Sequence, residues 1–197
     1  MWTTRTRGAI IAEAYAPYIR KGNRALDVGC GNGVVSKVLA DRFSLDLTGT
    51  DIADYRKEKI GFVPMDGVRL PFADGSFELV FLNDVLHHTD DQAALLAEAR
   101  RVGRTVLAFE VEPGFGIALF DRFINFFHHR GMPTPLTFRT ADGWRRWATD
   151  RGIAATVIPL GRPRRWYPFR HVLLVTHTDH GRPRAAVQSA DRELHPR

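Results

Sequence analysis

Short apolar runs alternate with amphipathic segments over the first part of the chain. Five of these runs predict buried strands. They are ALDVG (25–29), LDLTGTDI (45–52), FVPMDG (62–67), FELVFLND (77–84) and TVLAFEVEP (105–113). Apolar residues recur instead at helical spacing over residues 7–20, 34–43 and 90–102, which predicts amphipathic helices. Strands and helices in this order predict a parallel sheet with right-handed crossovers and helices on both faces.

The alternation stops after Pro113. A strongly aromatic run, IALFDRFINFFHH (117–129), is followed by a loop that contains prolines. The next segment, ADGWRRWATDRG (141–152), predicts a helix that Thr140 caps at its start and that ends at Gly152.

Two more predicted strands follow, ATVIPL (155–160) and RHVLLVTHT (170–178). The link between them, GRPRRWYPF (161–169), is too short for a crossover helix, so they are expected to pair antiparallel. We therefore predict an α/β fold: a Rossmann-like doubly wound seven-stranded sheet, mostly parallel with one antiparallel C-terminal strand. Residues 1–178 form a single domain in this prediction, and residues 179–197, which show no periodicity, form a disordered basic tail.

Basic residues are concentrated in the C-terminal part. The formal net charge is +6, and residues 139–197 carry 12 Arg and only 5 acidic residues. Such a segment suits an anionic partner such as RNA, a membrane surface or a phosphorylated substrate. We favour the alternative, a solvated Arg-rich face with a frayed end, because many of these Arg residues fall in loop-like sequence. A small-molecule substrate is therefore expected rather than nucleic acid.

The sequence contains no signal for membrane insertion or disulfide formation. No apolar run approaches the roughly 18–20 residues that cross a bilayer, and Arg, Glu and Pro interrupt the N-terminal segment. We therefore predict a cytoplasmic protein without a membrane span. The only cysteine, Cys30, permits neither a disulfide nor a multi-cysteine zinc site. His128 and His129 lack carboxylates at ligand spacing, so no metal is expected.

A glycine-rich loop, DVGCGNG (27–33), follows the first predicted strand. Glycines let the backbone turn sharply there and approach a ligand closely. The spacing is G-x-G-x-G, because Val34 and Val35 follow Gly33, so the loop departs from the G-x-G-x-x-G dinucleotide fingerprint. Asp51 ends the second strand about 20 residues further on, where a carboxylate can accept both hydrogen bonds of a ribose diol. Together these features predict an adenosine-type ligand.

Several stretches resemble one enzyme family. ALDVGCGNG, TGTDI, PMDGVRLPFADGSFELVFLNDVLHH and the following helix are similar to motifs I to IV of the class I S-adenosylmethionine-dependent methyltransferases, in the group related to the ubiquinone and menaquinone methyltransferases. The resemblance covers roughly residues 20–113 and implies S-adenosylmethionine as cofactor and S-adenosylhomocysteine as product. Residues 101–104, Arg-Val-Gly-Arg, stand where the family commonly has Pro-Gly-Gly, so a tighter turn is expected before the fifth strand.

The resemblance also implies the cofactor contacts. Asp27 and the glycine loop would lie beside the methionine moiety, Asp51 on the ribose and Ile52 against the adenine. A helix cap is the alternative role for Asp51. The full predicted set is Asp27, Gly29, Cys30, Gly31, Asn32, Gly33, Asp51, Ile52, Met65, Asp66, Gly67, Asn83 and Asp84.

The third and fourth strands carry the rest of that set. Asp66, flanked by Met65 and Gly67, would accept from the adenine amino group, and its alternative role is that of a simple turn residue. Asn83 and Asp84 would border the methionine end of the cofactor and the substrate.

Three residues are candidates for catalysis. Methyl transfer needs little covalent help, because the enzyme must mainly align the attacking atom with the methyl group. His87 and His88 follow the fourth strand, and a neutral imidazole suits the removal of a hydroxyl or amine proton. At most one of them is expected to act, the alternative being a histidine that only caps or packs. Glu110, at the end of the fifth strand, either orients a histidine or the substrate, or is a solvated acid.

The substrate class follows partly from exclusion. A pyrimidine C5 methyltransferase needs a cysteine nucleophile, and Cys30 belongs to the cofactor loop. Asn83 does not begin the Asn-Pro-Pro-Tyr type motif of adenine-modifying relatives. Residues 1–20 and 114–138 are the expected lid elements, and the aromatic run suggests an apolar pocket; a core or dimer contact is the alternative.

We therefore predict methyl transfer to a small, largely apolar or aromatic metabolite, by a monomer or a homodimer. The acceptor atom, O, N or C, stays open. The alternatives are an RNA methyltransferase that uses the Arg-rich C-terminal region and a non-catalytic S-adenosylmethionine-binding module.

Overall fold

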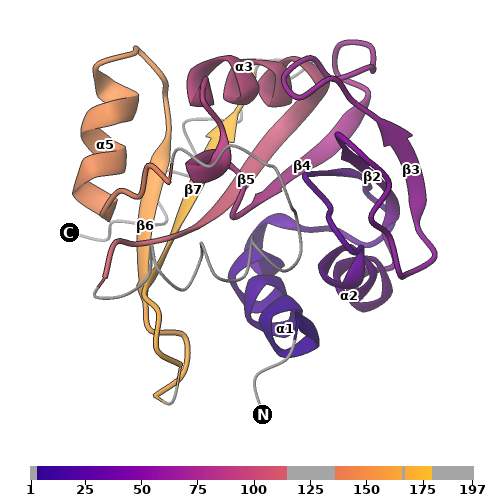
Figure 1. The fold of residues 1–197 in the computed structure, drawn as a ribbon, viewed down its shortest axis with the longest axis horizontal. Helices are drawn as coiled ribbons and strands as arrows, with labels where there is room; N and C mark the ends of the chain where they lie inside the picture. Colours follow the sequence, from indigo (N-terminus) through magenta and orange to yellow (C-terminus); the bar gives the residue numbers. More distant parts are fainter. Residues whose placement is uncertain (1–3, 115–135, 166, 179–197) are drawn as a thin grey trace.

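The computed structural model of the chain describes residues 4–114, 136–165 and 167–178. Within these residues, seven strands form one sheet in the order β3-β2-β1-β4-β5-β7-β6 (Figure 1). The strands are β1 (Arg24–Val28), β2 (Asp46–Asp51), β3 (Gly61–Pro64), β4 (Phe77–Asn83), β5 (Gly103–Val111), β6 (Thr156–Gly161) and β7 (His171–His177). Strand β7 is antiparallel to β5 and β6, and all other neighbours pair in parallel. The predicted architecture is confirmed.

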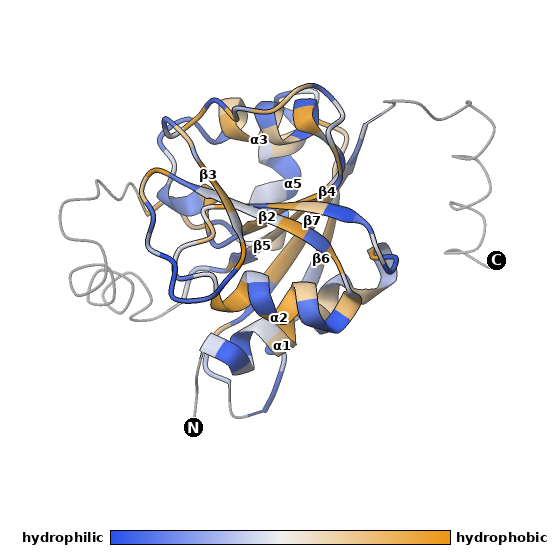
Figure 2. Ribbon diagram, turned by 90° about the vertical axis from the view of Figure 1, so that its right-hand side faces the viewer, coloured by the Kyte–Doolittle hydropathy of each residue, from blue (hydrophilic) through white to orange (hydrophobic). Residues whose placement is uncertain are grey.

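Helices cover both faces of this sheet. Helices α1 (Thr4–Tyr15) and α2 (Val34–Phe43) pack on one face, and α3 (Gln92–Val102) and α5 (Ala141–Thr149) pack on the other (Figure 2). Each face has its own apolar cluster, because side chains along a strand point alternately to the two faces. Trp144 of α5 is completely buried in the cluster beneath α3 and α5.

Local sequence signals explain where two of these helices begin or end. Helix α1 stops at Tyr15, earlier than predicted, because Pro17 has no N–H and its ring clashes with the preceding turn of a helix. Residues Ala16–Tyr18 form a short 3₁₀ turn, η1, instead. Thr140 is confirmed as the N-cap of α5, since its hydroxyl accepts from the Gly143 N–H at 3.2 Å.

Two of the connections between parallel strands contain no helix. Residues 52–60 lead from β2 to β3, and residues 65–76 lead from β3 to β4. Strand β3 ends at Pro64, so the last three residues of the predicted strand 62–67 belong to the second loop. Both loops begin at the carboxyl ends of their strands, which places them at the same edge of the sheet.

Some predictions concern residues that the structure does not describe. These are the aromatic run 117–129 with His128 and His129, most of the predicted lid segment 114–138, and the tail 179–197. In the described ranges, no helix is both long enough and apolar enough to traverse a bilayer.

Strand β5 begins directly after helix α3, with no residue between them. This agrees with the tight turn expected at residues 101–104. Gly103, the first residue of β5, makes this junction possible. A Cβ at this position would lie 2.3 Å from Val80 Cγ2 and 3.2 Å from the Ala99 carbonyl oxygen.

Gly103→Ala should therefore lower the free energy of unfolding by about 2 kcal/mol, because an added methyl group in a packed core displaces its neighbours. Urea unfolding at equilibrium measures the change. Gly61→Ala is the matched control: Gly61 also begins a parallel strand, but an added Cβ would lie 3.4 Å from its nearest atom. The control should change stability by less than about 0.5 kcal/mol. Equal losses in both variants would contradict this packing explanation.

Candidate functional site

The order of the sheet reverses between β1 and β4. Ligands of open α/β sheets bind outside the carboxyl ends of the strands at such a point. The loops after β1, β2, β3 and β4 all begin at this edge. Each predicted cofactor residue lies on one of these loops or within the last two residues of the strand before it.

The glycine loop folds tightly against its neighbours. Gly29, Gly31 and Gly33 have positive φ values of 69°, 51° and 76°, which residues with a Cβ rarely adopt. A Cβ at Gly29 would also lie 2.6 Å from Val85 Cγ2, in the loop after β4. Gly33 is the N-cap of α2, so the positive end of that helix adjoins the loop.

Cys30 and Asn32 make structural contacts within this loop. The Cys30 side chain packs on Gly49 of β2, where an added Cβ would lie 2.7 Å from the sulfur. Burial raises the pKa of the Cys30 thiol well above its ordinary value, so the thiol is protonated and unreactive at pH 7. Asn32 accepts from the Val34 N–H at 3.1 Å. Both side chains stabilise the loop from within.

Asp51 is hydrogen-bonded to the glycine loop. Its Oδ2 accepts from the Gly31 N–H at 2.9 Å, and its Oδ1 accepts from the Ile52 N–H at 2.8 Å. An ionised carboxylate has about four acceptor sites, so it can accept more than these two bonds. No helix forms in residues 52–60, which excludes the helix-cap alternative. The glycine loop and Asp51, which together predicted an adenosine-type ligand, are thus in direct contact.

Asp27 lies at the centre of a buried hydrogen-bond chain. It accepts from Ser36 Oγ at 2.6 Å and from Asn83 Nδ2 at 2.9 Å. Asn83 Oδ1 in turn lies 2.8 Å from the Tyr15 hydroxyl of α1. Burial raises the pKa of Asp27 to about 6, although the two hydrogen bonds oppose the shift. The sequence indicated Asp27 and Asn83, whereas Tyr15 was expected only to form part of an amphipathic helix face.

Asp84 has an unusual backbone conformation and a cationic partner. Its φ of 55° lies in the left-handed region, and its N–H donates to the Phe109 carbonyl oxygen at 2.8 Å. Arg7 of α1 forms an ion pair with its carboxylate. Although burial would raise the pKa of Asp84, the Arg7 guanidinium holds it below the ordinary value. Sequence reasoning missed Arg7, because one Arg among several in the N-terminal segment gives no signal.

His87 and Glu110 form a buried pair. His87 Nδ1 lies 2.6 Å from Glu110 Oε2, and each side chain is 1% exposed. Glu110 Oε1 accepts from the Val85 N–H at 3.0 Å and from the Leu86 N–H at 2.8 Å. The carboxylate thereby holds the start of the 3₁₀ turn η2 (Leu86–His88) and orients the histidine in it. The alternative of a solvated acid at Glu110 is wrong.

The surroundings of His87 distinguish it from His88. The His88 ring lies 4.0 Å from the His87 ring, between centroids, and His88 is less buried. The Phe138 ring lies 4.7 Å from His87, and the Thr137 N–H donates to the His87 carbonyl oxygen at 3.1 Å. The described end of the predicted lid segment therefore covers His87.

A further histidine, His171, lies near this group at the start of β7. It is buried, and its ring stacks on Phe109 with 4.4 Å between centroids. Burial lowers the pKa of His171 to about 4, so the ring is neutral at pH 7. Sequence reasoning placed His171 in a strand and gave it no role, because its approach to Asp84 and Arg7 depends on how β7 pairs with β5.

The loops after β2 and β3 carry the predicted adenine contacts. Ile52 and Val68 are 47% and 37% exposed, and no other large apolar side chain of the described residues is exposed. A Cβ at Gly67 would lie 3.9 Å from Ile52 Cγ2, so the two loops are adjacent. Asp66 accepts from the Arg69 N–H at 2.9 Å, the contact expected of a turn residue. Val68 had not been predicted, and its exposure is visible only in the fold.

Asp84, His87 and Glu110 each offer an atom that could ligate a metal, and these atoms lie within 4.8 Å of one another. Protein groups already engage all three. The Arg7 guanidinium pairs with Asp84. Glu110 accepts from the N–H groups of Val85 and Leu86, and its other oxygen contacts His87 Nδ1. Since the guanidinium also repels a cation, the group fits proton transfer better than metal binding.

Comparisons with known proteins find relatives of the chain. A family model described as a methyltransferase domain matches residues 26–105. The chain is 29% identical over 152 residues to 27-O-demethylrifamycin SV methyltransferase of Amycolatopsis mediterranei, covering 71% of this chain and 50% of the relative. It is 31% identical over 162 residues to demethylmenaquinone methyltransferase of Beutenbergia cavernae, covering 72% of this chain and 66% of the relative.

A solved structure shares the fold. It is geranyl diphosphate methyltransferase in complex with S-adenosylmethionine, with a TM-score of 0.63 and 13% identity over 88% of this chain and 84% of that one. The chain spans between half and two thirds of the length of the two sequence relatives named here.

The raised pKa of Asp27 predicts a pH dependence of stability. An acid with a folded pKa near 6 and an ordinary value of 3.8 binds more protons in the folded than in the unfolded state between these values. Stability should therefore fall as pH rises from about 4 to about 7, by roughly 2–3 kcal/mol from this group. Asp27→Asn should remove that part of the dependence, measured by urea unfolding at pH 4.5 and 7.5. Asp46→Asn, at the exposed start of β2, is the control. Identical pH profiles for wild type and Asp27→Asn would refute the assignment.

Proposed function

This chain belongs to the class I S-adenosylmethionine-dependent methyltransferases, and from that premise we propose that it methylates a small, largely apolar or aromatic metabolite and releases S-adenosylhomocysteine. The observation that carries the proposal is the buried His87–Glu110 pair beside the glycine loop and Asn83 at the end of β4. A cofactor-binding fold alone would not require a histidine oriented by a carboxylate at this point.

The residues present fit the cofactor. Gly29, Gly31 and Gly33 have no Cβ atoms where the backbone would approach a ligand, and the carboxylate of Asp51, the kind of group that binds a ribose diol, adjoins the loop. Ile52 and Val68 offer exposed apolar surface for the adenine. Asp27 and Asn83 would hold the amino-acid end.

The remaining residues supply proton transfer. When bound, S-adenosylmethionine provides an electrophilic methyl group on a positively charged sulfur. Glu110 favours the His87 tautomer with its proton on Nδ1, which leaves Nε2 as the basic nitrogen. His87 then accepts the proton of an acceptor hydroxyl or amine, and the Glu110 carboxylate stabilises the imidazolium that results.

The names of two relatives support the substrate class. One is named for a demethylrifamycin and the other for a demethylmenaquinone, and both names denote small molecules. In this sequence, the aromatic run at residues 117–129 supports the same substrate class, because it is expected to line an apolar pocket. RNA methylation and cofactor binding without catalysis are the competing outcomes of the experiments below.

Calorimetric titration with S-adenosylhomocysteine tests the cofactor assignment. Wild type should bind in the micromolar range, and NAD should not bind. Asp51→Ala should weaken binding at least tenfold, because hydrogen bonds to a charged group contribute about 1.5–3 kcal/mol each. Asp46→Ala, at the other end of the same strand, should bind as wild type does. Binding of NAD but not of S-adenosylhomocysteine would contradict the cofactor assignment.

Turnover with a panel of apolar phenols and hydroquinones tests the catalytic pair. His87→Ala should lower kcat by about 10²-fold or more, the usual contribution of a general base, while the affinity for S-adenosylhomocysteine stays unchanged. Glu110→Gln should lower kcat in the same direction. His177→Ala, on the far end of β7, is the control. If His88→Ala rather than His87→Ala loses activity, the assignment of the base is wrong. Methylation of RNA but of no small molecule would overturn the substrate class.

A further inference from the structure

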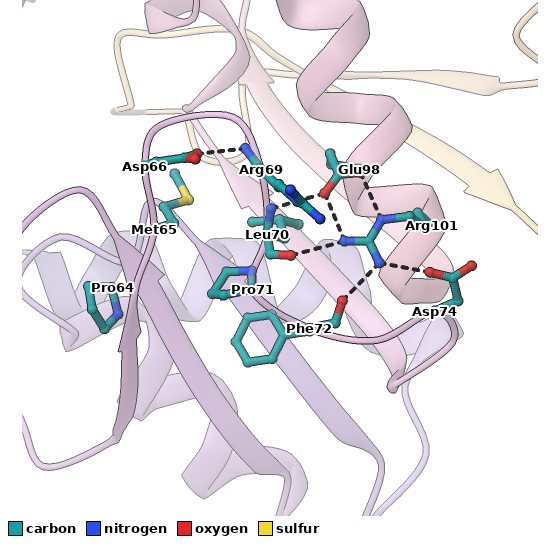
Figure 3. Close-up of a pocket in the computed structure, with 10 residues that line it drawn as sticks. All are labelled: Pro64, Met65, Asp66, Arg69, Leu70, Pro71, Phe72, Asp74, Glu98 and Arg101. Atoms are coloured by element: carbon teal, nitrogen blue, oxygen red, sulfur yellow. Dashed lines mark hydrogen bonds and ion pairs between the residues drawn. The ribbon is translucent and has the colours of Figure 1, made fainter.

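We propose that Arg101 is a positioning residue for the cofactor: it fixes the loop that forms the adenine wall of the site, without touching the cofactor itself. This inference rests on the proposed function. Arg101 lies in the last turn of α3, across the arch of the loop from Met65 and Asp66, two of the predicted cofactor contacts (Figure 3).

The Arg101 guanidinium donates with all five of its N–H groups. Nε and Nη2 donate to the two oxygens of Glu98, at 2.7 and 2.8 Å. Nη2 also donates to the Leu70 carbonyl oxygen at 2.9 Å. Nη1 donates to the Phe72 carbonyl oxygen and to Asp74 Oδ1, both at 2.8 Å. Three of the five bonds therefore end on the loop between β3 and β4.

Two further bonds complete the attachment. Glu98 Oε2 accepts from the Leu70 N–H at 3.0 Å, so Leu70 is held through both of its backbone polar groups. The Arg101 carbonyl oxygen accepts from the Gly75 N–H at 2.9 Å. The Arg101 hydrogen bonds also hold the pKa of Glu98 near 2, so this carboxylate is ionised at pH 7.

The loop is held by one apolar anchor together with these polar bonds. Leu70 is buried in the cluster beneath α3 and α5, and Met65 and Phe72 pack against that cluster. Residues 65–76 contain no helix, and a cavity of about 830 Å³ lies in the arch that the loop forms beside α3. Pro64, Met65, Pro71 and Phe72 line that cavity together with the Arg101–Glu98 pair (Figure 3). Around this open space, the hydrogen bonds of Arg101 and Glu98 fix the loop backbone at Leu70 and Phe72.

The same loop carries the predicted adenine contacts. Met65, Asp66, Gly67 and Val68 precede Leu70, and Asp66 accepts from the N–H of Arg69, the residue next to Leu70. A shift of Leu70 is therefore transmitted to Gly67, which adjoins Ile52 of the other loop. Arg101 fixes the position of Leu70 and hence the distance between the two loops.

Titration of wild type and Arg101→Gln with S-adenosylhomocysteine and with 5′-methylthioadenosine, which lacks the amino-acid end, tests the inference. We expect the dissociation constants of both ligands to rise by about tenfold, equivalent to ~1.4 kcal/mol, and by the same factor. In turnover assays the KM for S-adenosylmethionine should rise while kcat at saturation is unchanged. Backbone hydrogen exchange should accelerate over residues 65–75 and stay unchanged in β1 and β4.

Arg145→Gln is the matched control. Arg145 of α5 likewise donates to a carboxylate, that of Asp142, and to a backbone carbonyl, that of Val157. Its loss should lower thermal stability without changing either dissociation constant. Asp74→Asn weakens only one of the five Arg101 bonds, so it should raise both dissociation constants by a smaller factor. This variant replaces Arg101→Gln in the test if Arg101→Gln does not fold.

The outcomes separate this inference from the proposed function. Unchanged affinity in the folded Arg101 and Asp74 variants, or a lower kcat with unchanged KM, overturns the positioning role and leaves the methyltransferase proposal intact. If wild type binds neither ligand, the proposed function fails first and the positioning role fails with it. Loss of affinity for S-adenosylhomocysteine alone also overturns it, because an adenine wall must affect both ligands.

Discussion

The hydrogen bond from Asn83 Nδ2 to Asp27 Oδ1 joins the ends of the two central strands at the point where the sheet order reverses. Asp27 is buried and Asn83 is half-buried, so leaving the Asp27 carboxylate without this donor would carry a desolvation penalty. Gly29, the first glycine of the loop, lies two residues after Asp27, and the turn η2 that carries His87 begins three residues after Asn83. Through Tyr15 the same chain of bonds reaches α1. One polar contact therefore sets the relative position of three of the elements that surround the site.

Charge is distributed unevenly around this contact. Asp27, Asp84 and Glu110 place three carboxylates at one edge of the sheet, and each is compensated differently. Asp27 has neutral donors and an elevated pKa, Asp84 has the Arg7 guanidinium, and Glu110 has backbone N–H groups and His87. Only the last arrangement brings a carboxylate oxygen within 2.6 Å of an imidazole nitrogen. We accordingly propose that pair for proton transfer.

Loops replace crossover helices on the cofactor side of the sheet. The connections after β2 and β3 bring exposed apolar side chains to the site, but they cannot pack as a helix does. Hydrogen bonds contribute to their positions: the Gly31 N–H donates to Asp51, and the Arg101 guanidinium donates to residues 70, 72 and 74. The loop after β3 therefore combines an apolar anchor at Leu70 with a small number of polar contacts.

The sequence by itself determined the features that depend on neighbouring residues. Alternation of apolar runs with helical periodicity predicted the strands and helices, Thr140 predicted a cap, and the glycine loop with Asp51 predicted an adenosine-type ligand. Only the tertiary structure decided which of two adjacent histidines meets Glu110, because the direction of each ring depends on how the turn after β4 packs on β5. Arg7 lies 77 residues from Asp84, and Arg101 lies 27 to 31 residues from its loop partners. Contacts at such separations arise from the order and pairing of the strands, and no local pattern encodes them.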